Sequence, residues 1–468
     1  MTSEYTGRET AGEPAAHQLA QGTPVGSALD TDDPTAWISL DIEVRELSRP
    51  RLYPVHPRPA PPRRRWLSRV LPPLRAEPEA ASSRPSPDAG LAVVRALPPA
   101  TYDTEPALAL ALCDADGHVR EAALARIPTG SALLPLVVIR CADWASPVRD
   151  RARELLRAEL PARTPEELAA LAPLLLRIDR RERGTFAAGL LETALRTPPY
   201  DHLKAQLGSA DRDTRRFAHR IAAAGQVLDP AEFARSAARD PDVVVQSCCA
   251  EAALAGVRPD AYDEVLGPLL AARNPQVRAA GVTALRKAER PVEAEPFLAD
   301  RSPVVRACAR YVVRQYDIDP LPVYRAWCAE QGPAALPIGA PIGLAECGDR
   351  QDAGLLWPLT EHPDPAIRSR AVAGLRTLDV FDTGRLIPLL DDPSPAVTRE
   401  TVTSLIPSAR RIPVDHLVDR LTPDRPRHHR LASIRLLAAQ GGTRQLRILR
   451  ALLEDEDAKV RERAGRTR

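Results

Sequence analysis

Apolar and polar positions along this chain recur in a phrase of about thirty residues. An Asp-containing turn leads to a β-branched residue, which is followed by Arg in most copies and by a small residue four positions later. Apolar residues seven and eight positions later continue one side of a helix of 3.6 residues per turn. The pattern therefore predicts a short amphipathic helix at each copy. Nine clear copies have Val119, Val148, Thr214, Val245, Val277, Val305, Ile367, Val397 and Val460 in the β-branched position.

The spacing of these copies predicts a repeat architecture. Neighbouring β-branched residues are separated by 28–32 or by 62–66 residues, so each long gap should hold a degenerate copy. One such copy has His429 in the β-branched position, and two weaker copies lie near Gly184 and Leu336. About thirty residues suffice for two short helices and two turns. About twelve such units in series predict an all-α solenoid over residues 89–468.

Turn chemistry supports a helix start at each copy. Asp211 and Asp242 precede the β-branched residue by three positions, where a carboxylate can accept hydrogen bonds from the first backbone N–H groups. Pro in the first helical turn, as at Pro275, needs no hydrogen-bond partner for its nitrogen. The small residue, for example Ala309, should allow a neighbouring helix to approach closely. We interpret the Arg as a structural partner of Asp in its own or the next repeat.

These phrases resemble HEAT repeats of the phycobilisome-lyase-like type. The resemblance rests on Asp240-Pro-Asp-Val-Val-Val-Gln246 and on the stretch from Gly343-Leu-Ala-Glu-Cys-Gly to His362-Pro-Asp-Pro-Ala-Ile-Arg368, and it extends over residues 90–468. It implies a superhelical stack whose second helices line a concave binding surface. Such repeats occur in scaffolds, transport factors, some lyases and some DNA glycosylases, so the resemblance selects an architecture and no single function.

Residues 1–88 have a different composition. Residues 1–35 are polar and acidic, whereas residues 48–76 carry eight Arg, no acid and many Pro. Such segments bury too little apolar surface to offset the entropy of ordering, so we predict a disordered arm. Two short apolar islands lie within it. The first is predicted to dock on a partner or on the solenoid's own flank, with a short terminal cap as the alternative. For the second, a solvated basic linker is the favoured interpretation, and docking in a partner groove or on an anionic membrane surface is the alternative. Their key residues are Trp37, Leu40, Val44, Trp66 and Leu67.

Charge adds one local feature. The chain has 64 Lys+Arg and 62 Asp+Glu, a formal net charge of +2, which indicates no strongly polyanionic partner for the whole chain. Its wealth of Arg, Ala and Pro is typical of a GC-rich coding sequence, as in actinomycetes. Residues 408–450, with ten Arg and three Asp, depart from this balance. We predict that a partner or an anion binds there to Arg425, Arg427, Arg430 and Arg435.

Catalytic and metal-binding motifs are missing from the sequence. Seven Cys have no CxxC spacing, nine His have no metal-binding spacing, and no phosphate loop or nucleophile elbow occurs. We therefore predict no cofactor, no metal and no enzymatic activity. Two weaker candidates are a metal site that combines Asp415, His416, Asp419 and His429, and a glycosylase-like pocket at Asp143 and Trp144. For both, a structural role within a repeat is the favoured interpretation.

The pattern thus predicts a non-enzymatic scaffold or adaptor that binds another protein on the concave side of an α-solenoid. A nucleic-acid-binding solenoid that uses residues 408–450 is the alternative, and a HEAT-like lyase or DNA glycosylase is the third hypothesis. No apolar run reaches the roughly 20 residues of a membrane span, and residues 1–20 lack the apolar centre of a signal peptide. We therefore expect a cytoplasmic protein.

Overall fold

The computed structural model describes residues 14–48, 102–330 and 336–466. Every regular element in these ranges is a helix, and the described residues contain no strand. The chain divides into two compact units, Met1–Val227 and Leu228–Arg468, which are described separately. The predicted all-α, HEAT-like solenoid is confirmed, because helix pairs follow one another throughout both units.

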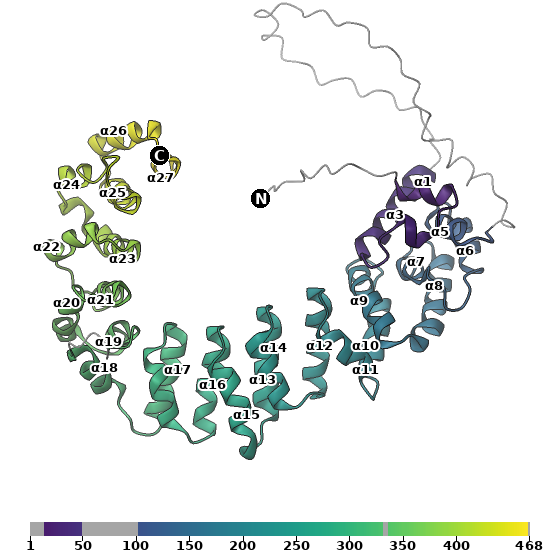
Figure 1. Cartoon of the computed structure of the whole chain (residues 1–468), viewed down its shortest axis with the longest axis horizontal. Coiled ribbons are helices and arrows are strands. Elements are labelled where there is room, and N and C mark those ends of the chain that lie inside the picture. The colour runs from purple at the N-terminus through teal and green to yellow at the C-terminus, as the bar shows by residue number, and fades with distance from the viewer. Residues whose placement is uncertain (1–13, 49–101, 331–335, 467–468) are drawn as a thin grey trace, which may run out of the picture. The chain divides into compact units, whose positions relative to one another are not determined.

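The first unit begins with three N-terminal helices and continues with four helix pairs, each with a first and a second helix (Figure 1). The N-terminal helices are α1 (Ala15–Ala20), α2 (Val25–Ala28) and α3 (Pro34–Ser48). The pairs are α5 (Glu105–Cys113) with α6 (Gly117–Leu124), α7 (Leu134–Arg140) with α8 (Ser146–Glu159), α9 (Pro165–Asp179) with α10 (Thr185–Arg196), and α11 (Asp201–Leu207) with α12 (Arg212–Gly225). A short 3-10 segment, η3 (Leu160–Ala162), extends α8.

The second unit contains eight helix pairs. Its first four are α13 (Pro230–Arg239) with α14 (Val243–Gly256), α15 (Tyr262–Leu270) with α16 (Pro275–Lys287), the 3-10 helix η5 (Pro291–Ala299) with α17 (Pro303–Arg314), and α18 (Pro320–Ala329) with α19 (Ala340–Cys347). The last four are α20 (Ala353–Leu359) with α21 (Pro365–Thr377), α22 (Thr383–Leu386) and η7 (Ile387–Asp391) with α23 (Pro395–Leu405), α24 (Val414–Val418) with α25 (Arg427–Gln440), and α26 (Thr443–Ala451) and η9 (Leu452–Glu454) with α27 (Ala458–Gly465). Turns hold η4 (Pro259–Ala261), η6 (Arg350–Asp352) and η8 (Ile406–Arg411).

The four and eight pairs in the described residues give the twelve repeats that the spacing predicted. The two weak copies near Gly184 and Leu336 correspond to the second helices α10 and α19. Within the second unit, α20, α22 and α24 lie along one side of the stack, and α21, α23 and α25 lie along the other (Figure 1). Consecutive second helices pack against each other, as α21 does on α23 and α23 on α25. We call the side of the second helices that faces away from the first helices the second-helix face.

The motif residues form the core of each repeat. Val148, Val245, Val277 and Val305 are almost fully buried, and so is Ala309, four positions after the last of them. A small residue is required there because the neighbouring helix is close. At Gly281, the same position of α16, an added Cβ would lie 3.0 Å from the Cβ of Leu269, tighter than ordinary van der Waals contact.

The motif Arg links three elements of the stack. In Arg278, Nη1 donates to the backbone oxygens of Ala272 and Arg273, each at 2.8 Å, and so satisfies carbonyls of the turn between α15 and α16. Its Nε and Nη2 donate to the two carboxylate oxygens of Asp300 in the next repeat, each at 2.9 Å. Arg368 repeats this arrangement with Asp392 at 2.7 and 2.9 Å. The structural interpretation of the motif Arg is therefore confirmed.

Residues 14–48 differ from the disordered segment predicted from composition. They form α1, α2 and α3, and α3 packs on α5, α7 and α9. Trp37, Leu40 and Val44 are each at most 2 % exposed, because they lie on one side of the helix and cover the solenoid's own apolar surface. The average composition of this segment did not indicate that α3 docks on the solenoid, because three well-spaced apolar residues suffice to dock one helix.

Charged residues of α3 also enter the core of the first unit. Asp41 pairs with Arg140, and Arg45 pairs with Asp143 at 3.2 Å. The second predicted docking segment, with Trp66 and Leu67, lies outside the described residues, and the arm boundary at residue 88 stays a prediction.

Candidate binding surface on the second helices

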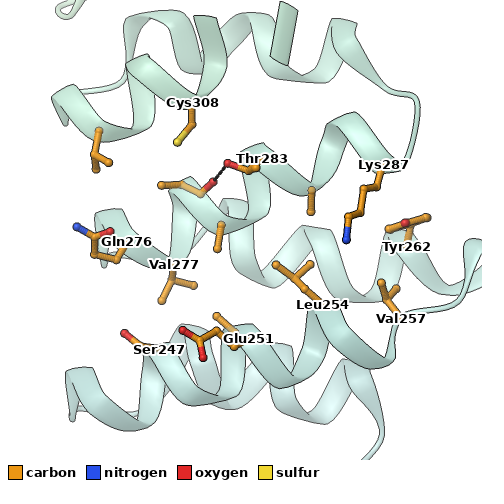
Figure 2. Close-up of a pocket in the computed structure, with 15 residues that line it drawn as sticks. Ser247, Glu251, Leu254, Val257, Tyr262, Gln276, Val277, Thr283, Lys287 and Cys308 are labelled. Atoms are coloured by element: carbon orange, nitrogen blue, oxygen red, sulfur yellow. Dashed lines mark hydrogen bonds between the residues drawn. The ribbon is translucent and has the colours of Figure 1, made fainter. Parts of the chain in front are cut away.

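A trough of about 650 Å³ lies over α14, α16 and α17 in the second unit. Residues of these three second helices line one space, and Figure 2 shows Glu251 of α14, Thr283 of α16 and Cys308 of α17 around it. Most side chains of its wall are apolar or small, and only a few are polar. We call this hollow the second-helix trough, and its lining is Ser247, Ala250, Glu251, Leu254, Val257, Tyr262, Gln276, Val277, Ala279, Ala280, Thr283, Ala284, Lys287, Val304 and Cys308.

The repeat register explains why the trough forms here. Positions two, three and six after the β-branched residue face outward on a second helix, because the position itself and the one four later face the core. In α14 and α16 these outward positions hold several small residues, among them Ser247, Ala280 and Thr283. The Thr283 hydroxyl donates to the Ala279 carbonyl oxygen at 2.8 Å, so this side chain lies back along its own helix (Figure 2). Short side chains leave the hollow open.

Two charged residues lie on the wall of the trough. Glu251 extends from α14, and Lys287 lies at the end that Tyr262 and Val257 close (Figure 2). Both side chains are exposed, and neither forms an ion pair with any described residue. A ligand can therefore meet one free carboxylate and one free ammonium group in an otherwise apolar surface.

Apolar exposure continues beyond the trough on the same face. Val244, at the start of α14, is 49 % exposed and occupies the register position of Gln276. Tyr311 on α17 is 42 % exposed at the register position of Thr283, and its hydroxyl accepts a hydrogen bond from Arg286 at 2.6 Å. Exposed apolar side chains next to a hollow are typical of a binding surface.

Metal-ligating side chains do not cluster in the part of the chain that the structure describes. No group of three or more His, Cys, Asp or Glu in ranges 14–48, 102–330 and 336–466 could hold a metal ion. The suggested metal site is not assembled, because Asp415 pairs with Arg444 and the His429 ring contacts the Asp392 carbonyl oxygen at 2.9 Å. Burial raises the pKa of Cys141, Cys249 and Cys328 to about 12. These thiols are therefore protonated at neutral pH and are poor nucleophiles.

Asp143 has a structural environment. Its carboxylate accepts two hydrogen bonds from Arg120, at 2.8 and 3.0 Å, and one from Arg140 at 3.1 Å. Burial alone would raise the pKa of Asp143, but the hydrogen bond from Arg120 and the charge of Arg140 outweigh burial and lower it. Such a carboxylate stays ionised, unlike the general acids of enzymes, whose pKa is raised. Trp144 beside it is exposed, with the Arg120 guanidinium 5.7 Å from its ring centre.

Four of the ten arginines in the basic stretch 408–450 have an Asp partner. Arg427 pairs with Asp457, and Arg430 pairs with Asp455 and donates to the Leu421 carbonyl oxygen at 2.9 Å. Arg430 is 5 % exposed, so this side chain is part of the packing at the start of α25. Further pairs join Arg420 to Asp391 and Arg444 to Asp415.

The four arginines predicted as one anion-binding group do not share one environment. Arg425 is exposed in the turn before α25, and Arg427 and Arg430 are paired at the start of that helix. Arg435 lies later on α25, half-buried on the second-helix face. Each paired Arg forms its ion pair with an acidic residue of a neighbouring repeat. A sum of charges over one stretch of sequence does not include these partners.

Comparisons with known proteins add only distant likenesses. No family model matches the chain, and no curated protein matches it. The structure is similar to that of Kap121p bound to Nup53p, with a TM-score of 0.30 and 15 % identity over 75 % of this chain and 47 % of that chain. Kap121p bound to the extreme C-terminus of the phosphatase Cdc14p gives a TM-score of 0.30 at 16 % identity, with the same coverage. YibA of E. coli gives a TM-score of 0.25 at 16 % identity, over 60 % of this chain and 95 % of that one.

The chain spans about half the length of Kap121p. Likenesses at these TM-scores carry no argument about function, so the candidate surface depends on its own geometry. None of the described helices has the length and apolar character that crossing a bilayer requires.

Proposed function

We propose that this protein is a non-enzymatic scaffold that binds a partner protein along the second-helix face, with the second-helix trough as the anchor. The trough itself is the observation that carries the proposal. It combines a volume of about 650 Å³ with small and apolar walls from three consecutive second helices. A volume in this range is large enough to bury several side chains of a ligand.

The chemistry of the trough favours a short protein segment as its occupant. Leu254, Val257 and Val304 offer partly buried apolar contacts, which suit apolar side chains of a partner. The free Glu251 carboxylate suits a basic residue, and the free Lys287 ammonium group suits an acidic one. We therefore expect a segment with apolar anchors between charges of opposite sign, for which complementary charges provide orientation.

Binding without catalysis is the function that these residues support. The trough holds a single carboxylate, at Glu251, and a single ammonium group, at Lys287; no His lines it, and these two charged groups form no ion pair with each other. General acid–base or nucleophilic catalysis needs at least two such groups within hydrogen-bond reach. The trough offers contact area and two charges, which is what a docking surface requires.

A substitution in the trough tests this proposal. Thr283→Arg should fill the hollow with a long charged side chain and weaken the partner at least about tenfold, since a buried unpaired charge disfavours binding. Thr283 is exposed, so the fold should be unaffected. The measurement captures proteins from the source organism with the wild-type chain, with Thr283→Arg and with a control variant. The amount of each captured protein is then compared among the three.

Thr193→Arg is a matched control. Thr193 is an exposed residue of α10 in the first unit, and its hydroxyl donates to the Gly189 carbonyl oxygen at 2.9 Å, as Thr283 does to Ala279. The control should retain every captured protein. Equal capture by wild type and Thr283→Arg, or equal loss with both variants, would contradict the proposal.

A further inference from the structure

A second row of arginines lies on the second-helix face, apart from the buried motif arginines. It consists of Arg370 on α21, Arg399 on α23, Arg435 on α25 and Arg463 on α27. These residues lie two, three or six positions after the β-branched position of their repeats, or after His429 in α25. The same register positions, in α14 and α16, line the second-helix trough. We call the four residues the outer arginine row.

Members of the row lie on helices that are packed against one another. α21 contacts α23, α23 contacts α25, and α25 contacts α27. Arg435 is in the middle and half-buried. Burial and the positive charges of Arg463 and Arg399 lower the pKa of Arg435, while Glu400 acts in the opposite direction. Three guanidinium groups therefore lie near one another across α23, α25 and α27.

The charge of the row is not neutralised by the described residues. None of its four arginines forms an ion pair in ranges 14–48, 102–330 and 336–466. The nearby Glu400 pairs with Arg376 at 3.0 Å. By contrast, Arg420, Arg427 and Arg430 each have an Asp partner. In a chain with a net charge of only +2, this is a local excess of positive charge that is free to bind an anionic ligand.

We propose that Arg399, Arg435 and Arg463 bind an extended acidic segment of a partner protein across α23, α25 and α27. This inference rests on the proposed function and names the chemistry of a second contact on the same face. Guanidinium groups bind carboxylates through two parallel hydrogen bonds, so arginine suits such a segment.

Geometry suggests how the acidic residues are spaced. Packed helices lie about 8–10 Å apart, and an extended chain advances about 3.3–3.6 Å per residue. A carboxylate at about every third residue of the segment would therefore meet one Arg per helix.

A protein segment fits this surface better than a single-stranded nucleic acid. Helices α21, α23, α25 and α27 contain no Phe, Tyr or Trp. Single-stranded nucleic acids are usually held by aromatic rings on which bases stack, together with basic groups that contact phosphates. The outer arginine row offers charges alone, spaced by helices, which suits carboxylates carried on an extended backbone.

A peptide titration tests the proposal on the full chain. The probe is a fluorescent peptide of about twelve residues with Glu at every third position in a Ser and Gly background, long enough to cross three helices. Fluorescence anisotropy at low salt should show binding that weakens as salt rises, because exposed charge pairs are screened. R399A/R435A/R463A should bind the peptide about tenfold more weakly, since each exposed pair contributes modestly. A peptide with Gln in place of Glu should not bind.

R410A/R411A/R447A is the matched control, with the same loss of three charges. Arg410 and Arg411 are exposed on η8, in the turn before α24, and Arg447 is exposed on the first helix α26, so the control should bind the Glu peptide like wild type. Unchanged binding by R399A/R435A/R463A, binding of the Gln peptide, or tighter binding of a single-stranded DNA of similar length would overturn the inference. Thr283→Arg should bind the Glu peptide normally, so a failure at the trough and a failure at the row are distinguishable.

Discussion

Replacement of Asp143 by Ala is expected to destabilise the first unit by about 3–5 kcal/mol, the usual cost of removing one partner of a buried ion pair. The Arg120 and Asp143 side chains are fully buried, and that of Arg140 is 1 % exposed. Without the carboxylate, both guanidinium groups stay buried with their charges less compensated. Arg45 of α3 loses the same partner, so the contact of α3 with the solenoid should weaken as well.

Hydrogen exchange followed by mass spectrometry at increasing urea measures this effect segment by segment, which suits a chain with two compact units. Peptides from α5 to α9 should exchange faster in Asp143→Ala than in wild type, and peptides from the second unit should be unchanged. Glu192→Ala is the control, because Glu192 pairs with Arg196 on the exposed side of α10 and its removal should be close to neutral. Similar exchange in both variants would show that the buried network does not stabilise the unit.

The effect of Asp143→Ala should also depend on pH in a defined direction. The pKa of Asp143 is lowered in the folded chain, so its contribution is fully present above the pKa of an unfolded Asp, about 3.9. The contribution is lost as the pH falls through the lower value in the folded state. The difference between wild type and Asp143→Ala should therefore shrink on acidification below about pH 4.

Replacement of Ala309 by Leu is expected to destabilise the second unit by about 1–3 kcal/mol through overpacking. Ala309 is fully buried within the core cluster of that unit. Three additional carbon atoms there must displace a neighbouring helix or take an unfavourable rotamer. The same exchange measurement should show faster exchange in α16, α17 and η5, which pack together.

Ala307→Leu on the same helix is the control for Ala309→Leu, because Ala307 is exposed and an added side chain meets no core. Arg310→Ala on the same helix is unsuitable as a control. Arg310 is half-buried and pairs with Glu346 at 2.7 Å. Equal stability of Ala309→Leu and Ala307→Leu would mean that the small motif residue does not determine how closely the helices pack.

The architecture could be predicted because the repeat motif places core residues, helix starts and linking side chains at fixed spacings. Val305 and Ala309 are buried, and Asp242 accepts hydrogen bonds from the N–H groups of Val244 and Val245 at the start of α14. The partner of a motif Arg, such as Asp300 for Arg278, follows from the same register. These features depend on residues near in sequence or one repeat away.

The candidate surface could be predicted only in part. A charge sum along residues 408–450 does not include Asp391, Asp455 and Asp457, which lie outside that stretch and neutralise three of its arginines. The trough and the outer arginine row both consist of residues at the register positions that face outward. These positions can be identified only when it is known which side of each second helix the first helix covers. With that register, the small residues at Ala280 and Thr283 would have indicated a hollow.

The claim that the second-helix face binds the partner is tested most directly by hydroxyl-radical footprinting of the chain with and without its captured partner. Tyr311 on that face and Phe381 in the turn before α22 are a matched pair of aromatic residues, 42 % and 43 % exposed. The account predicts that the partner lowers the oxidation of Tyr311 and of the trough residue Leu254, while Phe381 and Trp144 react as before. Protection of Phe381 or Trp144 with no change at Tyr311 and Leu254 would contradict it.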